Sequence, residues 1–255
     1  MKTFRLLLVF LLIPSLCYAS ASRSFSGNDG DEVSIADVAA LRPGTSAFSQ
    51  VIWFNGGSQA NAIFTKRLNS SPFNQWSIWA GSITGTCDAF NSNQQIAVTI
   101  IESYTTDMWC TNTNSNYLDS TWRMIVVTRP ATDTDPLVYI DGSVVAVTDN
   151  TDNATQPQNV TTTVAWEIGN NNGQNNSFAG DLSNALLYSR ELTAIEVSEI
   201  RFKPEMVPDA RELYMPVWGD ATEVDLSGNG RTGAVTGTTT SASGPPIGFG
   251  GLLPL

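Results

Sequence analysis

Short runs in which apolar and polar residues alternate recur from residue 25 onward, separated by clusters of Gly, Asn, Asp, Ser and Thr. Alternation with a period of two is typical of strands that bury one face, and the clusters are typical of turns. Many short strands with frequent turns favour an all-β sandwich or barrel. The expected strands are residues 33–35, 48–54, 63–68, 75–79, 96–101, 122–128, 137–140, 144–147, 164–168, 182–188, 213–216 and 233–236.

Two local signals refine this pattern. Asp141-Gly142 separates two apolar runs and suits a type I′ hairpin, because both central residues of that turn adopt positive φ. Thr193 with Glu196 is a capping box, so we expect one short helix to begin there. Its apolar face would be supplied by Leu192, Ile195, Val197 and Ile200. A helix this short is marginal alone and must pack against the strands.

The first residues have the pattern of a secretory signal peptide. Lys2 and Arg5 precede the apolar run 6–13, Pro14 ends that run, and small residues follow at 19–21. The run is too short to anchor the chain in a bilayer, so we expect an exported protein without membrane insertion. The predicted organisation is a signal peptide at 1–21, one folded domain at 22–243, and a Pro/Gly-rich tail at 244–255 that packs as a terminal strap.

Charge and rare residues exclude several functions. The formal net charge is −11, and it becomes −13 once Lys2 and Arg5 are removed with the signal peptide. This excess of acid argues against nucleic-acid binding, which requires a basic surface. The chain contains no histidine, which excludes a Ser-His-Asp triad and histidine-ligated zinc.

Two cysteines, Cys87 and Cys110, remain after processing. In an oxidising compartment an even pair most often forms a disulfide, and the loop that it closes would contribute roughly 3 kcal/mol. Four Asn-x-Ser/Thr patterns also predict glycosylation if the source is a eukaryote, and they begin at Asn69, Asn153, Asn159 and Asn175.

Several motifs occur in a characteristic order: residues 122–129, the VYIDG run at 138–142, Ile168-Gly169, the stretch 178–200, and the DLSGNG turn at 225–230. Together they resemble the laminin-G-like branch of the concanavalin A-like lectin/glucanase superfamily. The resemblance implies a jelly-roll β-sandwich with one short helix. In many relatives the last turn opens the domain, and neighbouring termini would permit the shift. Ser183 stands where relatives often have an acidic residue, so the stretch 178–202 is interpreted as scaffold.

Calcium is the candidate cofactor. Asp225, Ser227 and Asn229 offer oxygen atoms at alternate positions of one turn, and Asp29 could join them if the termini are adjacent. The alternative is an Asx-turn in which Asp225 or Asn229 bonds its own backbone.

Sugar stacking would require aromatic faces on loops. Trp109, Tyr104 and Tyr117 lie in a polar stretch that a Cys87–Cys110 disulfide would brace. The alternative is that Trp109 packs against the disulfide. The remaining tryptophans that lie in apolar strand patterns are assigned to the core: Trp53, Trp76, Trp122 and Trp166.

Relatives that hydrolyse glucans carry clustered carboxylates on one strand, whereas the glutamates of this chain are scattered. We therefore predict a secreted, non-catalytic module that binds extracellular carbohydrate or a cell-surface partner, with calcium as its candidate cofactor. The alternative is a self-assembling surface or structural protein. The oligomeric state is left open.

Overall fold

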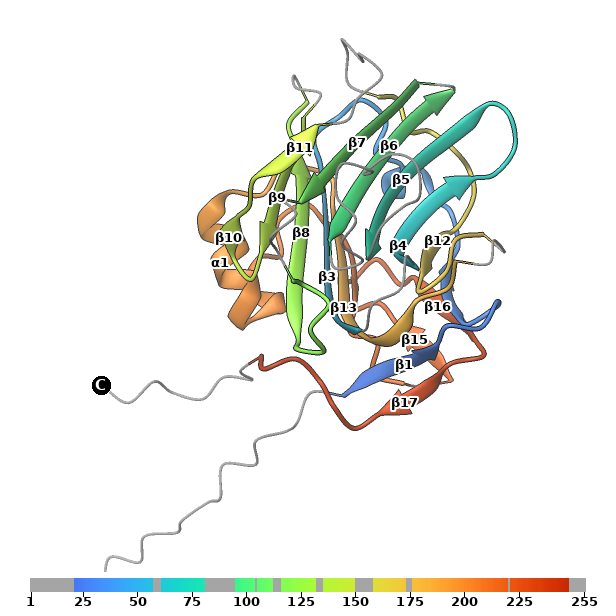
Figure 1. The fold of residues 1–255 in the computed structure, drawn as a ribbon, viewed down its shortest axis with the longest axis vertical. Helices are drawn as coiled ribbons and strands as arrows, with labels where there is room; N and C mark the ends of the chain where they lie inside the picture. The colour runs from blue at the N-terminus through green and yellow to red at the C-terminus, as the bar shows by residue number, and fades with distance from the viewer. Residues whose placement is uncertain are drawn as a thin grey trace, which may run out of the picture.

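The computed structural model describes residues 21–56, 61–80, 95–103, 105–111, 116–131, 135–149, 158–172, 176–219 and 221–247. The predicted signal peptide lies outside these residues, apart from Ala21. The described strands form two antiparallel sheets that face each other as a sandwich (Figure 1). The predicted jelly-roll sandwich with a short helix is confirmed.

Sheet A contains eight strands. Seven follow the order β10 (Ser143–Val144), β9 (Leu137–Ile140), β8 (Arg123–Arg129), β3 (Phe48–Gly56), β13 (Ala179–Tyr188), β1 (Ser22–Ser26) and β17 (Thr239–Ser241). The eighth, β14 (Arg211–Met215), pairs with the second half of β13. Because β1 pairs with both β13 and β17, the first and last strands are neighbours, as predicted.

Sheet B contains nine strands, in the order β11 (Val147–Asp149), β7 (Thr105–Thr111), β6 (Ile96–Ser103), β5 (Phe73–Ala80), β4 (Asn61–Leu68), β12 (Trp166–Ile168), β2 (Glu32–Ile35), β16 (Thr232–Thr236) and β15 (Thr222–Val224). The predicted strand at 144–147 is divided, since Val144 belongs to sheet A and Val147 to sheet B. Strand β7 was not among the strands expected from the sequence.

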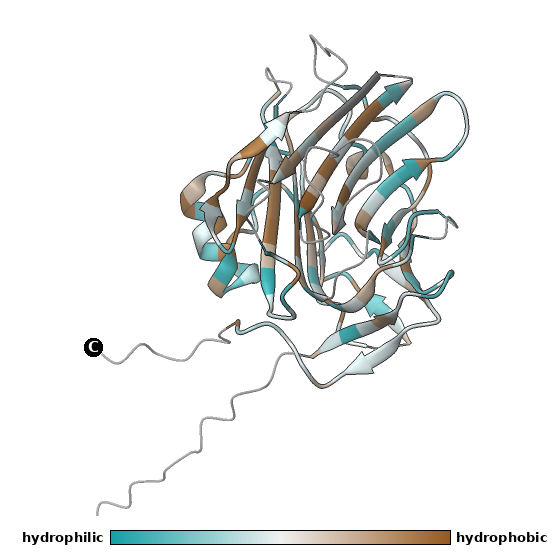
Figure 2. Cartoon of the chain, in the orientation of Figure 1, coloured by the Kyte–Doolittle hydropathy of each residue, from teal (hydrophilic) through white to brown (hydrophobic). Residues whose placement is uncertain are grey.

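The inner faces of the two sheets enclose the main core. Alternate residues of each strand point inward, so Phe48 of β3 meets Trp76 of β5 and Trp166 of β12, with ring centroids 5.4 and 6.0 Å apart. Figure 2 shows apolar residues concentrated on the central strands, whereas the peripheral strand β17 is pale. Large buried aromatic rings dominate the energetics of such a core.

Helix α1 (Ala194–Phe202) covers the outer face of sheet A beside β9 and β10 (Figure 1). The predicted capping box is present: Thr193 Oγ1 accepts the Glu196 N–H at 3.3 Å, and Glu196 Oε2 accepts the Thr193 N–H at 2.9 Å. Val197 and Ile200 pack on the sheet, but Ile195 is 73% exposed. The apolar face of the helix is therefore narrower than predicted. The described residues also form two short 3₁₀ helices, η1 (Ala39–Leu41) and η2 (Pro204–Met206).

Candidate functional site

Trp109 lies inside the sandwich. It is a residue of β7, its side chain is 1% exposed in the main core, and its indole N–H donates to Asp135 Oδ1 at 3.2 Å. The ring therefore has no free face for a sugar, which corrects the prediction of a stacking loop at Trp109. The alternative contact with a disulfide is also corrected, because neighbouring residues of a strand point to opposite faces and Cys110 points out of the core.

The structure describes only some of the other residues of the predicted sugar loop. Tyr117 is half-buried against the main core, and Tyr104 lies outside the described residues. Cys110 is buried on the outer face of sheet B, whereas Cys87 lies outside the described residues. The disulfide between them stays a prediction.

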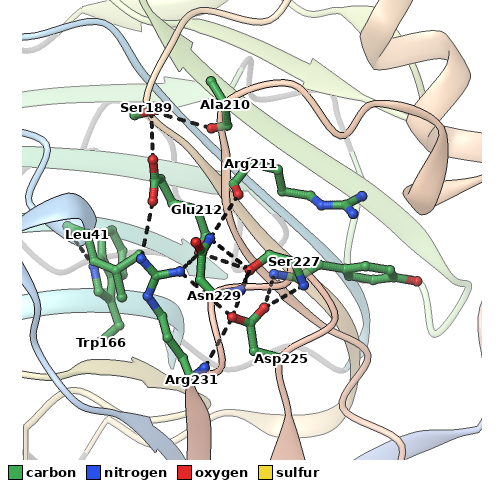
Figure 3. A network of polar contacts seen from close by, with 11 residues as sticks. Leu41, Trp166, Ser189, Ala210, Arg211, Glu212, Asp225, Ser227, Asn229 and Arg231 are labelled. Carbon is green, nitrogen blue, oxygen red and sulfur yellow. Dashed lines mark hydrogen bonds and ion pairs between the residues drawn. The ribbon is translucent and has the colours of Figure 1, made fainter.

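The predicted calcium turn is closed by its own hydrogen bonds (Figure 3). Asp225 Oδ1 accepts the backbone N–H groups of Tyr214 at 2.9 Å and of Ser227 at 2.8 Å. Asp225 Oδ2 accepts the Ser227 hydroxyl at 2.7 Å, and the Arg231 guanidinium lies 3.8 Å away. The Asn229 side-chain amide donates to the carbonyl oxygens of Arg211 and Glu212. The contacts favour the Asx-turn, with a guanidinium as the neighbouring cation.

Asp29 is not near this turn. Thr236 lies opposite Glu32 and Gly233 lies opposite Ile35, so the loop that contains Asp29 adjoins the Thr236 end of β16. The 225–231 turn precedes the other end of the same strand. The expectation that Asp29 joins Asp225 is therefore corrected. Among the described residues there is no group of three or more His, Cys, Asp or Glu that could hold a metal ion.

A row of polar side chains crosses the outer face of sheet B. Consecutive strand registers place Ser34, Glu167, Thr65, Ser77 and Thr99 side by side. Ser77 is fully buried and Thr65 is 1% exposed. This face is therefore closed to a large ligand, although its chemistry is polar.

Glu167 is the titratable group of this row. Burial raises its pKa from 4.5 to about 7, a shift that the backbone N–H of Asn172 opposes and the nearby Glu32 reinforces. Proton uptake at this carboxyl is therefore linked to folding near neutral pH.

An accessible cavity lies on the opposite side of the molecule, where the end of α1 meets sheet A. Its volume is about 210 Å³. Five separate segments of the chain line it, with the residues Trp53, Trp122, Met124, Asp141, Arg201, Phe202 and Pro246. We call it the α1 cavity.

Strand pairing sets the floor of the α1 cavity. Trp53 of β3 lies opposite Met124 of β8, and both side chains are buried. Trp122, just before β8, is half-buried, and Phe202 at the end of α1 is 58% exposed. Two aromatic rings at the rim are thus accessible, whereas the residues of the floor are buried.

The predicted hairpin turn positions the carboxylate of the cavity. Asp141 and Gly142 have φ of 52° and 85°, which confirms the prediction of two positive φ angles. Asp141 Oδ1 accepts the Met124 N–H at 2.9 Å, and Oδ2 accepts from Arg123 at 3.0 Å. A Cβ built at Gly142 would lie 3.4 Å from Cδ of Arg201, so the turn packs closely against the last turn of α1.

The C-terminal segment forms a further wall. Pro245 and Ile247 are buried, and Ile247 joins the apolar cluster between α1 and sheet A. Pro246 between them lines the cavity, and the Trp122 indole N–H donates to Ser243 Oγ at 3.2 Å. The described start of the tail, residues 244–247, therefore packs against the domain, whereas the rest of the tail lies outside the described residues.

This site was not predicted from the sequence. Trp122 was assigned to the core because it adjoins an apolar run, and Arg201 and Phe202 were interpreted as the end of a scaffold helix. One usable signal was present: Trp122 precedes its strand and follows the polar residues Asp119-Ser120-Thr121.

A second hollow, of about 410 Å³, lies beside the 225–231 turn. Its charged residue is Arg231, which already contacts Glu212 and Asp225. The residues that line it include no aromatic ring: Ala36, Val38, Ala40, Asn229, Gly230, Arg231 and Thr232. The α1 cavity therefore has the richer chemistry for ligand recognition.

Residues 26–198 match the family described as the concanavalin A-like lectin/glucanases superfamily. A search of curated protein sequences gives no match. Among the described residues, no helix has both the length and the apolar character needed to cross a bilayer.

Three solved structures illustrate the similarity of the fold. A candidate carbohydrate-binding protein of Bacteroides ovatus is 14% identical with a TM-score of 0.60, over 91% of this chain and 62% of that chain. The binding domain of Paraclostridial Mosquitocidal Protein 1 is 11% identical with a TM-score of 0.54, over 72% of this chain and 43% of that one.

The third is the binding domain of botulinum neurotoxin serotype G, at 14% identity and a TM-score of 0.50, over 69% of this chain and 41% of that chain. Identities this low establish a shared fold and no more. This chain also spans less than two thirds of the length of each of the three proteins.

Proposed function

Because the chain belongs to the concanavalin A-like lectin/glucanase superfamily, we propose that it is a non-catalytic carbohydrate-binding protein and that the α1 cavity holds the sugar. The main support for this proposal is that Trp122 and Phe202 present accessible rings at one small cavity, which Asp141 and Arg201 also line. Ligand sites in proteins combine apolar and aromatic walls with a few polar groups that set orientation.

The chemistry of these groups suits a sugar ring. A pyranose has apolar C–H faces that pack against aromatic rings, and hydroxyl groups at its edge that need donors and acceptors. Trp122 and Phe202 supply the first, while Asp141 and Arg201 supply the second. The cavity volume of about 210 Å³ is smaller than the ~300–1,000 Å³ of sites that bind drug-sized ligands. The cavity therefore fits one sugar residue and not a long segment of polysaccharide.

Binding without turnover is favoured by the carboxylates at this site. Glycosidases of most families use two carboxyl groups on either side of the scissile bond. Asp141 is the one carboxylate among the described residues that line the cavity, and both of its oxygens already accept hydrogen bonds. A second group for acid/base catalysis is not supplied there. The predicted signal peptide would place this binding outside the cell.

The test is a glycan array followed by titration calorimetry with the best ligand, using the purified protein. We expect Trp122→Ala and Phe202→Ala to weaken binding at least tenfold each, about 1.4 kcal/mol, with unchanged circular dichroism. Trp218→Ala is the matched control, because Trp218 is 38% exposed but does not line the cavity. Equal losses in the control and the cavity variants would contradict the site. No binding on a broad array, together with regular oligomers by light scattering, would favour a self-assembling structural protein.

A further inference from the structure

Two charged side chains line the α1 cavity, and their situations differ. Asp141 is paired within the protein, because it accepts from Arg123 at 3.0 Å and from the backbone N–H of Met124 at 2.9 Å. Arg123 in turn contacts Asp119 at 2.7 Å. Asp141 therefore has partners within the protein before any ligand arrives, and its remaining lone pairs are left to accept hydrogen bonds from sugar hydroxyls.

Arg201 has no such partner among the described residues. Among the residues that the structure describes, none of the recorded ion pairs involves its guanidinium. Its stem lies against Gly142, and its guanidinium carbon is 5.6 Å from the centre of the Phe202 ring. The cation is thus located beside an accessible aromatic face and is available to an anionic group.

We propose that the α1 cavity selects a sugar residue that carries a carboxylate, and that Arg201 is the residue that determines this specificity. This inference rests on the proposed function. A guanidinium presents parallel N–H donors that match the two oxygens of a carboxylate. The ring of the same sugar lies against Trp122 or Phe202, which fixes its carboxylate toward Arg201.

The attraction to this ligand is local. The whole chain carries a net charge of −11, which repels anions at a distance. At physiological ionic strength charges are screened beyond about 8 Å, so direct contact with Arg201 outweighs that repulsion. A cavity of about 210 Å³ has the volume of about seven waters of ~30 Å³ each, which suits a single residue such as a uronic or sialic acid.

The experiment uses an array of acidic glycans, with uronic-acid and sialic-acid oligosaccharides each printed beside its methyl ester and beside a sulfated analogue. We expect the free acids to bind at least tenfold more tightly than their esters. Arg201→Gln should abolish that preference, and Arg201→Lys should retain part of it. Lys203→Gln is the matched control and should keep the full preference, because Lys203 is cationic but does not line the cavity.

The outcomes separate the two proposals. Equal binding of acids and esters, or tighter binding of sulfated glycans, would overturn the carboxylate specificity while leaving carbohydrate binding in place. An acid preference that survives Arg201→Gln would overturn the role of Arg201. Failure of every glycan to bind would overturn the proposed function itself.

Discussion

Arg23 donates from Nε and Nη2 to one oxygen of Glu223, Oε1, at 3.0 and 2.7 Å, and both side chains are almost entirely buried. Arg23 belongs to β1 of sheet A and Glu223 to β15 of sheet B, so this ion pair joins the two sheets. Glu223 also accepts two backbone N–H groups, that of Gly219 at Oε1 and that of Trp218 at Oε2, so both carboxylate oxygens have partners.

Removing one partner of this pair should be costly. We expect Glu223→Ala to lower the free energy of unfolding by about 3–5 kcal/mol, because Arg23 is left as a buried charge. The double variant Arg23→Met, Glu223→Leu should lose much less than the sum of the single variants. Urea unfolding measures both. Asp119→Ala breaks the half-exposed pair with Arg123 and should cost about 1 kcal/mol or less. A Glu223→Ala loss no larger than this control would show that the pair contributes little.

The pKa of Glu167 predicts an unusual dependence of stability on pH. Burial raises this pKa to about 7 in the folded protein, against 4.5 when unfolded, so the folded state binds the proton more tightly. The associated stability is fully present below pH 4.5 and is lost as pH rises through about 7. The total loss is about 3 kcal/mol on the basis of ~1.4 kcal/mol per pKa unit. Urea unfolding at pH 5 and pH 8 should show this loss in the wild type and a flatter profile in Glu167→Gln. Parallel profiles of the two proteins would contradict the assignment.

Gly180 should not tolerate a side chain. Its φ is +146°, and a Cβ there would lie 2.4 Å from the carbonyl oxygen of Asn55 and 2.6 Å from Cα of Gly56. Both are backbone atoms of β3, so Gly180→Ala must disturb the pairing of β3 with β13. We expect a loss of more than ~3 kcal/mol or failure to fold. Gly228→Ala is the control: its φ is +92°, but nothing lies within 4 Å, so ~1 kcal/mol of backbone strain is expected. Thermal unfolding of both variants decides the point.

The Asp225 turn allows a direct test of the predicted calcium site. We expect the melting temperature to be the same in millimolar calcium and in EDTA, because Arg231 already lies beside Asp225. Asp225→Asn should cost about 1–3 kcal/mol through the loss of acceptor contacts to Ser227 and Arg231. A melting temperature that rises with calcium in the wild type but not in Asp225→Asn would instead establish the predicted ligands.

The parts of the fold that were predicted well from the sequence are those determined by residues close to one another in the sequence. Thr193 and Glu196 are three residues apart, and their capping box depends on little else. Asp141-Gly142 likewise specifies its own backbone angles. β7 was missed because its residues, TTDMWCT, lack a clear alternation and adjoin an Asn-rich loop. Pairing of β7 with β6 directs Trp109 into the core, and this pairing produces no recognisable pattern in the sequence near Trp109.

The α1 cavity could not be predicted for the same reason. Trp53, Trp122, Asp141, Phe202 and Pro246 are spread over most of the chain and meet only after β3 and β8 pair and α1 docks. The chemical types at the site are ordinary at each position. These residues form a site only because the strand pairing and the docking of α1 bring them close together.

The pairing of β1 with β17 places Ser22 opposite Ser241, and this has a consequence for how such a fold can be encoded. Joining those two strands by a linker and opening the chain at a surface turn would leave every strand beside its present neighbours. The order of the strands along the sequence can thus be circularly permuted while their order within the sheets stays the same. A circularly permuted gene would therefore specify the same sandwich.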